Sequence, residues 1–214
     1  MSNIASLCFN GTWDLIGDEG GQLTSPSHAL AECYAQRPPL PARVPAPIHA
    51  VLQDAGRIGD VNLGCNSLQA RWVEETIWTY RRTFEAPGEA AQQHAWLAFD
   101  ALEYEANVYL NGEHVGQHAN AHRPARFDVT GTLRDGENLL VVQIDTGVFS
   151  AADQPAGQLG ATGLALLTKR GLMRKSQCQG GWDWQARLVN VGIVGDVRLE
   201  WCPGARLDEA SVVG

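Results

Sequence analysis

Two indole side chains flank one carboxylate in Trp182-Asp183-Trp184, directly after Gly180-Gly181. An indole offers a flat apolar surface to the C–H face of a pyranose, and a carboxylate accepts hydrogen bonds from two neighbouring hydroxyl groups. Glycine lets the backbone turn sharply or approach a ligand closely. The motif therefore suits a sugar-binding loop. In an alternative interpretation, both tryptophans are core residues of a β-domain and Asp183 caps a turn. Because a four-residue match is weak, the motif alone favours this alternative.

Two acidic and two basic residues are further candidates for a functional site. Glu103 and Glu105 are two positions apart, so they would share one face of a strand. Because Glu103 and Glu105 lie beside a predicted hairpin, we expect them to be solvated charges at a sheet edge rather than a catalytic pair. Arg174-Lys175 is expected to lie on a solvated face. A further alternative is that this basic pair binds a carboxylate, for example Asp183, and fixes its position.

The histidines and cysteines do not show the pattern of a metal site. His114, His118 and His122 have the spacing of ligands on one helix face, but Gly116 interrupts them, so we expect ordinary strand or loop histidines. The cysteines are irregularly spaced, with neither metal-site pairs nor a legible disulfide framework. They are Cys8, Cys33, Cys65, Cys178 and Cys202. We therefore predict no metal and no cofactor.

The composition is that of an ordinary globular protein. Of the 214 residues, 44% are hydrophobic and 19% are charged, which argues against global disorder. The formal net charge of -8 argues against nucleic acid as a partner, because phosphates attract the opposite sign. No stretch approaches the roughly 20 apolar residues that span a membrane. The first residues lack the pattern of a signal peptide, so a reducing, cytoplasmic location is predicted.

Alternating apolar and polar residues predict many short strands. Asn111-Gly112 is a strong hairpin signal, because both central positions of a type I′ turn need positive φ. Residues 138–144 are nearly all apolar, so both faces of that strand are expected to be covered. The other predicted strands comprise residues 29–35, 77–84, 94–101, 106–110, 126–129 and 189–201.

Helical signals are few. One short helix is predicted over residues 47–55, because Pro47 suits a helix start and Gly56 suits its end. Residues 147–172 show no clear period and are predicted to form a long loop, which in a compact domain is more often functional than not. Many short strands separated by turn signals indicate an all-β sandwich, and residues 1–214 fit a single domain.

Several blocks resemble, in family order, the start of a β-mannosidase of glycoside hydrolase family 2. The Tyr-Leu-Asn-Gly block at residues 109–112 is shared across that family, and the Trp-Asp-Trp block is more specific to its mannosidase branch. The other matching blocks are residues 44–49, Leu52, Gly56, Ile58, Asn66, residues 72–75, residues 78–84, Val115-Gly116, Asn120, residues 123–130, residues 136–138, residues 174–177, Arg187-Leu188 and Gly192-Ile193.

The resemblance implies a jelly-roll β-sandwich of the galactose-binding-domain-like type with one or two short helices. It implies that this is the N-terminal domain of a retaining exo-β-mannosidase-like enzyme, followed by an immunoglobulin-like domain and a catalytic (β/α) barrel. The Trp-Asp-Trp loop would then reach the active-site pocket. There Asp183 would hold hydroxyl groups of the terminal mannose, and Trp182, with Trp184, would contact the sugar. The implied partners are a β-mannoside substrate and the chain's own downstream barrel.

The chain departs from the family pattern near this motif. Gln185-Ala186 stands where the family has Gly-Pro, Gly180 replaces an aromatic residue, and residues 194–196 replace a Trp-Arg-Pro run. Losing a proline and gaining a glycine both increase backbone freedom. These changes predict a looser loop, in which the pose of Asp183 is less firmly fixed.

Catalysis is not expected from these residues alone. A retaining glycosidase needs two carboxyl groups about 5–5.5 Å apart, and a catalytic barrel takes roughly 250 residues. A chain of 214 residues cannot hold that barrel beside the sandwich, and its end is interpreted as a cut before the next domain. We therefore expect no catalytic residue here, and a role in orienting the terminal sugar.

Other functions remain open from the sequence. The chain could be a stand-alone carbohydrate-binding module, because that class uses the same type of fold. It could be a structural domain that braces a barrel, in which case Trp182 should be buried. It could also be the same domain of a β-galactosidase or β-glucuronidase, because these enzymes share the sandwich.

Overall fold

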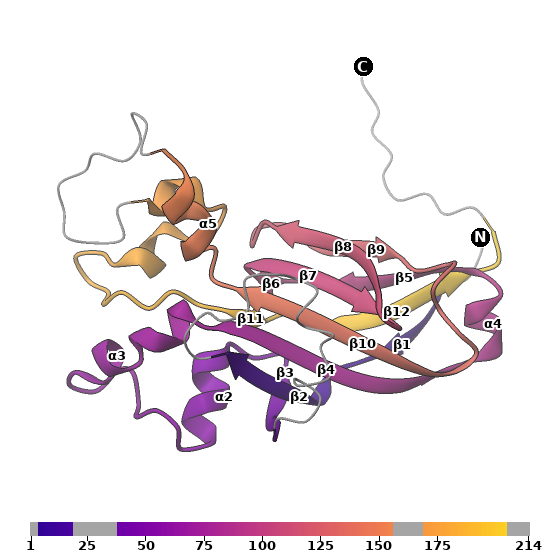
Figure 1. The fold of residues 1–214 in the computed structure, drawn as a ribbon, viewed down its shortest axis with the longest axis horizontal. Coiled ribbons are helices and arrows are strands. Elements are labelled where there is room, and N and C mark those ends of the chain that lie inside the picture. The colour runs from indigo at the N-terminus through magenta and orange to yellow at the C-terminus, as the bar shows by residue number, and fades with distance from the viewer. Residues whose placement is uncertain (1–3, 19–37, 156–168, 205–214) are drawn as a thin grey trace.

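The protein is described by a computed structural model that covers residues 4–18, 38–155 and 169–204. Two antiparallel sheets form its body, and short helices lie at the two ends (Figure 1). The predicted all-β sandwich is confirmed. The predicted strand at residues 29–35 lies outside the described residues.

The larger sheet has six strands in the order β3-β2-β4-β10-β7-β8. Its centre is the pair formed by β4 and β10, whose antiparallel register runs from Ala86 opposite Gly136 to Trp78 opposite Ile144. Its strands are β2 (Gly11–Asp18), β3 (Leu40–Val44), β4 (Ile77–Ala86), β7 (Glu105–Leu110), β8 (Glu113–Ala119) and β10 (Gly136–Asp145).

The smaller sheet has four strands in the order β1-β12-β5-β9. They are β1 (Ala5–Cys8), β5 (His94–Phe99), β9 (Ala125–Asp128) and β12 (Val197–Cys202). A short ladder pairs β6 (Leu102–Glu103) with β11 (Gly192–Ile193). This ladder joins the region that follows β5 to the segment that precedes β12.

The core lies between the two sheets and follows the period of two that a strand imposes. On β10, Leu140 and Val142 are fully buried in the main core. Val141 points to the opposite face, where it packs against Tyr109 in a separate cluster. Both faces of β10 are therefore covered, as the apolar run predicts. Burial of each such side chain stabilises the fold by about 1.5–3 kcal/mol relative to exposure.

The hairpin predicted at Asn111-Gly112 joins β7 to β8. Asn111 has φ 52° and Gly112 has φ 88°, the left-handed values that a type I′ turn requires. The Asn111 side chain also donates to the Thr132 carbonyl at 2.9 Å and accepts from the Leu139 amide at 3.0 Å. The same residue thus forms the turn and ties it to neighbouring backbone.

Short helices lie at the two ends of the sandwich, with α4 at the end opposite α2, α3 and α5 (Figure 1). Helix α2 (Ile48–Asp54) confirms the predicted helix: Pro47 is its N-cap, and Gly56 follows it with φ 67°. In the described residues the other α-helices are α3 (Asn66–Gln69), α4 (Gly88–Ala91) and α5 (Val148–Asp153). Three 3-10 helices are η2 (Arg71–Glu75), η3 (Arg170–Leu172) and η4 (Gln177–Gly180).

The excursion after β10 lies at the same end of the molecule as α3 (Figure 1). The sequence predicts an irregular loop over residues 147–172. The described parts of this segment instead form α5 at its start and η3 at its end, and residues 156–168 lie outside the described residues. The side chains of Tyr104, Ala151 and Met173 make a small buried cluster there. This packing explains a helix that the local sequence period does not reveal.

Candidate sugar-binding site

The Trp-Asp-Trp motif forms a tight turn. The Trp182 amide donates to the Gln185 carbonyl at 2.9 Å, and the Gln185 amide donates to the Trp182 carbonyl at 3.2 Å. Asp183 and Trp184 are the two central residues of this turn, and Gly181 precedes it with φ 101°. The glycine is required here because an L-side chain rarely adopts that conformation.

All three predicted site residues are exposed. The exposed fraction is 45% for Trp182 and 72% for Trp184, and Asp183 between them is also exposed. The alternative in which both tryptophans are core residues is therefore wrong. An exposed carboxylate between two exposed indoles at the tip of a turn is free to meet a ligand.

Gln179 holds the two arms of this loop together. Its side-chain oxygen accepts from the Asn190 amide at 3.0 Å, and its backbone carbonyl accepts from the Leu188 amide at 3.0 Å. Its side-chain nitrogen donates to Oε1 of Glu103 at 3.1 Å. The loop is thus fixed both across its base and to strand β6.

A buried ion pair lies next to this anchor. Nζ of Lys175 is 3.2 Å from Oε2 of Glu103, and the side chains are 2% and 14% exposed. The same ammonium donates to the carbonyls of Asn190 at 2.6 Å and Thr146 at 3.4 Å. Burial lowers the pKa of Lys175, and the Glu103 carboxylate acts in the opposite direction. The ammonium group is therefore surrounded by one carboxylate and two backbone carbonyls that offset part of the cost of its burial.

These contacts correct two expectations from the sequence. The sequence predicts a solvated edge charge for Glu103 and a solvated face for Lys175, yet Lys175 is buried, Glu103 is partly buried, and each is paired with the other. Lys175 therefore pairs with Glu103 and not with Asp183. Glu105 is half-buried and accepts a hydrogen bond from the Ser150 hydroxyl. Glu103 and Glu105 lie on different strands, β6 and β7, and do not share one strand face.

A second buried carboxylate supports the other arm of the loop. Glu74, on η2, is 1% exposed. Its Oε2 lies 2.6 Å from Nη2 and 2.8 Å from Nε of Arg187, and its Oε1 accepts from the Val189 amide at 3.1 Å. The Glu74 carbonyl also accepts from the Thr146 hydroxyl at 2.8 Å. Glu74 lies in one of the blocks that resemble the family, but nothing in that block indicates its ion pair, because its partner lies 113 positions away.

Two more titratable groups, Asp145 and His49, interact electrostatically with Lys175. Burial raises the pKa of Asp145 to about 6; Glu105 adds to this effect, while the Gly147 amide and Lys175 oppose it. Burial lowers the pKa of His49 to about 4, and the Lys175 charge acts in the same direction. Neither ring nitrogen of His49 has a hydrogen-bond partner within the described parts of the chain. Both shifts favour the uncharged form of the group inside the fold.

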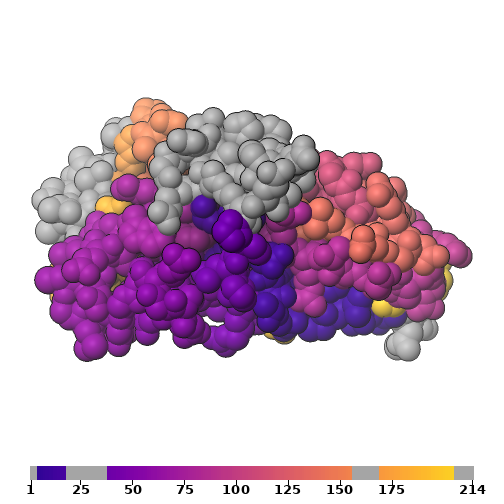
Figure 2. All heavy atoms as spheres, turned by 60° about the horizontal axis from the view of Figure 1, so that its bottom comes forward, coloured from indigo at the N-terminus to yellow at the C-terminus, as the bar shows by residue number. Residues whose placement is uncertain are grey.

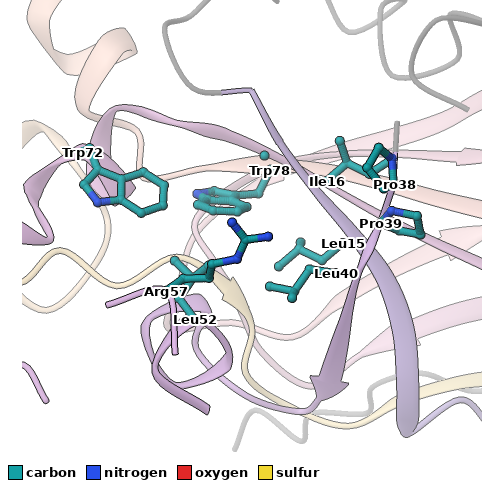
Figure 3. Close-up of a pocket in the computed structure, with 10 residues that line it drawn as sticks. Leu15, Ile16, Pro38, Pro39, Leu40, Leu52, Arg57, Trp72 and Trp78 are labelled. Carbon is teal, nitrogen blue, oxygen red and sulfur yellow. The ribbon is translucent and has the colours of Figure 1, made fainter. Parts of the chain in front are cut away.

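A separate hollow of about 400 Å³ opens beside α2 (Figure 3). The Trp72 and Trp78 rings, 6.0 Å apart between centroids, line one side. The Arg57 guanidinium is directed toward the Trp78 indole, and Leu15 and Leu40 lie beyond it (Figure 3). Figure 2 shows the surface that residues 38–75, in purple, form at this end of the molecule. The hollow thus combines aromatic surface with one cation.

The histidines and cysteines have ordinary environments. His114 and His118 lie on β8, and His118 contacts the Asn120 carbonyl at 2.7 Å. Cys8 and Cys65 are exposed and Cys202 is buried, all as free thiols, while Cys33 lies outside the described residues. Across residues 4–18, 38–155 and 169–204, no group of three or more His, Cys, Asp or Glu residues is arranged to hold a metal ion. In the same ranges, none of the helices is both long and apolar enough to cross a membrane.

Comparison with known proteins defines the family. The family described as "Glycosyl hydrolase 2 galactose-binding domain-like" matches residues 24–195. The chain therefore belongs to this family of domains from glycoside hydrolase family 2, and its fold is the galactose-binding-like β-sandwich that the sequence resemblance implies.

Among the relatives, β-mannosidases are prominent. A β-mannosidase B of Emericella nidulans is 36% identical over 160 residues, which cover 73% of this chain and 19% of that protein. A β-mannosidase B of Aspergillus terreus is 37% identical over 162 residues. The crystal structure of a β-D-mannosidase from Dictyoglomus thermophilum superposes with a TM-score of 0.78 at 27% identity, covering 95% of this chain and 23% of that one.

Other solved glycosidase structures share the fold at lower identity. A β-glucuronidase from an uncultured Clostridium matches with a TM-score of 0.57 at 20% identity, which shows the fold alone. The chain spans about a fifth of the length of the curated relatives that it matches.

Proposed function

We propose that this chain is the N-terminal domain of a retaining exo-β-mannosidase-like glycoside hydrolase, in which the Trp-Asp-Trp loop recognises the terminal mannose. The observation that carries the proposal is the exposed Asp183 between two exposed indoles, on a turn braced by the carboxylates of Glu74 and Glu103. The similarity to β-mannosidases supports the choice of sugar.

The proposed recognition follows from the chemistry of a pyranose. The ionised Asp183 would accept hydrogen bonds from two adjacent hydroxyl groups, and these are stronger than bonds between neutral groups. The exposed indoles would cover the apolar C–H face of the ring. Trp182 is 45% exposed in this chain, whereas a purely structural bracing role calls for a buried ring.

The catalytic carboxyl groups would come from a barrel that follows the sandwich in the same polypeptide, after an immunoglobulin-like domain. Retaining hydrolysis requires two carboxyl groups about 5–5.5 Å apart on either side of the glycosidic bond. The contribution of the present domain would be to hold the terminal sugar in line with them, which lowers the entropic part of the barrier. The 214-residue chain alone is expected to be inactive.

The test is to express the complete gene that encodes this chain and to assay 4-nitrophenyl β-mannoside beside the β-galactoside and the β-glucuronide. We expect the β-mannoside to be the preferred substrate. Asp183→Asn should lower kcat/KM by about 30- to 150-fold, because a hydrogen bond to a charged group contributes about 2–3 kcal/mol. Glu137→Gln, at an exposed position on β10, is the matched control. Equal rates for wild type and Asp183→Asn would overturn the proposed role.

The hollow of Figure 3 favours a second candidate function, a stand-alone carbohydrate-binding module. A half-buried Trp72 with the Arg57 cation nearby would provide a stacking surface and hydrogen-bond donors for a sugar. Calorimetry of the 214-residue chain with mannose and with mannan distinguishes the two functions. Binding that Trp72→Ala abolishes supports the module, and absence of binding supports an incomplete pocket that needs the barrel.

A further inference from the structure

We propose that Arg170 is a positioning residue that fixes the orientation of the Trp182 indole and leaves one face of that ring for the sugar. The inference rests on the proposed function of the Trp-Asp-Trp loop. The inference goes beyond that function because it assigns a role to a residue outside the motif, in η3 at the end of the excursion that follows β10.

The geometry places one guanidinium on two parts of the loop. The Arg170 guanidinium carbon lies 4.8 Å from the centroid of the Trp182 ring. Nη1 of the same group donates to the Gly181 carbonyl at 2.6 Å. Arg170 therefore contacts both the ring and the backbone that carries it, and it restrains the indole at two points.

The backbone of Arg170 is itself fixed. Nε2 of Gln177 donates to the Arg170 carbonyl at 3.0 Å and lies 3.4 Å from the Met173 carbonyl. Gln177 is the first residue of η4, which leads directly into the loop. These hydrogen bonds join the 3-10 helices η3 and η4, so the backbone from which the Arg170 side chain extends is fixed relative to the loop.

Arginine suits this arrangement better than lysine does. Its planar guanidinium can lie against an aromatic ring while an N–H group at its edge donates a hydrogen bond. A lysine ammonium could stay near the ring but would not form both contacts in the same geometry. The cation covers one face of Trp182, and only the opposite face and the ring edge remain for a pyranose.

The restraint on Trp182 affects how the sugar binds. A ring that is restrained before the sugar arrives loses less side-chain entropy on binding. The indole contacts the sugar in the ground state and in the transition state alike, so loss of the restraint should raise KM more than it lowers kcat.

The experiment uses the complete gene product and three variants at or beside this position. Arg170→Met keeps the length of the side chain without the cation, and Arg170→Lys keeps the charge without the planar group. Lys169→Ala is the matched control, because Lys169 donates to the carbonyls of Ala152 and Gln154 and is not seen against the ring. We expect Arg170→Met to raise KM about tenfold with kcat changed less than threefold, Arg170→Lys to rescue part of this, and Lys169→Ala to match wild type.

A double-mutant cycle separates positioning from a general effect on stability. Trp182→Phe is combined with Arg170→Met, and KM is measured for all four proteins. If Arg170 acts through the indole, Arg170→Met adds less than twofold in the Trp182→Phe background. The near-ultraviolet circular dichroism of the 214-residue chain gives a readout that needs no activity: Arg170→Met should change the indole band in wild type and leave it unchanged in Trp182→Phe.

The outcomes distinguish the two proposals. If Asp183→Asn impairs hydrolysis but Arg170→Met behaves like Lys169→Ala, the inference on Arg170 is wrong and the proposed function stands. If the gene product does not hydrolyse β-mannosides, the proposed function fails, and the dichroism still decides whether Arg170 orients Trp182. An equal loss from Arg170→Met in both tryptophan backgrounds shows a structural role and overturns the inference.

Discussion

Lys175 and Glu103 form an ion pair with 3.2 Å between Nζ and Oε2, in which the lysine side chain is buried and the glutamate side chain is 14% exposed. The pair joins strand β6 to the segment that leads into the Trp-Asp-Trp loop. Gln179 shares the same carboxylate through Oε1, and Asn190 shares the same ammonium through its carbonyl. One buried pair therefore sets the position of both arms of the loop relative to the sheet.

Lys175→Met should destabilise the chain by about 3–5 kcal/mol, because it leaves the Glu103 carboxylate buried without its cation. Lys175→Met combined with Glu103→Gln should be less destabilised than the sum of the two single variants, since a glutamine can still accept from Gln179. Urea unfolding followed by circular dichroism measures all four free energies. Strict additivity would show that the two residues do not interact.

Arg187→Ala should lower the free energy of unfolding by about 3 kcal/mol, because Glu74 then keeps a buried carboxylate whose remaining partner is a single amide. Asp100→Asn is the comparison, since it breaks the pair with Arg198, in which the side chains are 47% and 31% exposed. Exposed pairs contribute about 0–1 kcal/mol. Denaturant titrations of the two variants should differ accordingly, and equal losses would contradict the role of Glu74 as an anchor.

Features that depend on neighbouring residues could be predicted from the sequence. The hairpin at Asn111-Gly112 follows from the need for positive φ, and the end of α2 follows from Gly56. The two covered faces of β10 follow from its apolar run. In each case the physical cause lies within a few residues of the feature, so the pattern and the structure agree.

Features that depend on distant residues could not be predicted. The carboxylates of Glu74 and Glu103 are charged groups in unremarkable local sequence, and only the fold brings them to their buried cationic partners. The same holds for Arg170, which reaches Trp182 because the hydrogen bond from Gln177 holds η3 against η4. The roles of Trp182, Asp183 and Trp184 in sugar binding remain predictions.

Asp145→Asn should change the pH dependence of stability. Burial raises the pKa of Asp145 in the folded chain to about 6, above its ordinary value of 3.8. Between these values the folded state holds a proton that the unfolded state has lost, so this group's contribution is full below about pH 3.8 and is lost as the pH rises through 6. The free energy of unfolding of wild type minus that of the variant should fall by about 1.4 kcal/mol per pH unit in this window. A difference that is flat from pH 4 to 6 would contradict the raised pKa.

His49→Leu should produce the opposite slope. Burial holds the pKa of His49 at about 4, below its ordinary value of 6.5. Between these values the unfolded state binds a proton that the folded state does not, so the stability of wild type relative to the variant should rise with pH from about 4 to 6.5, by about 1.4 kcal/mol per unit.

His49 is only 4% exposed, and neither ring nitrogen has a hydrogen-bond partner within the described residues. Leucine can therefore replace it without the loss of a hydrogen bond there. In wild type the slopes of Asp145 and His49 overlap and largely cancel between pH 4 and 6. Urea unfolding at half-unit pH steps for wild type and both single variants exposes each slope in turn. If the free energies of unfolding of His49→Leu and wild type change with pH in parallel, the histidine binds its proton equally well in the folded and unfolded states. The lowered pKa of the buried His49 would then be wrong.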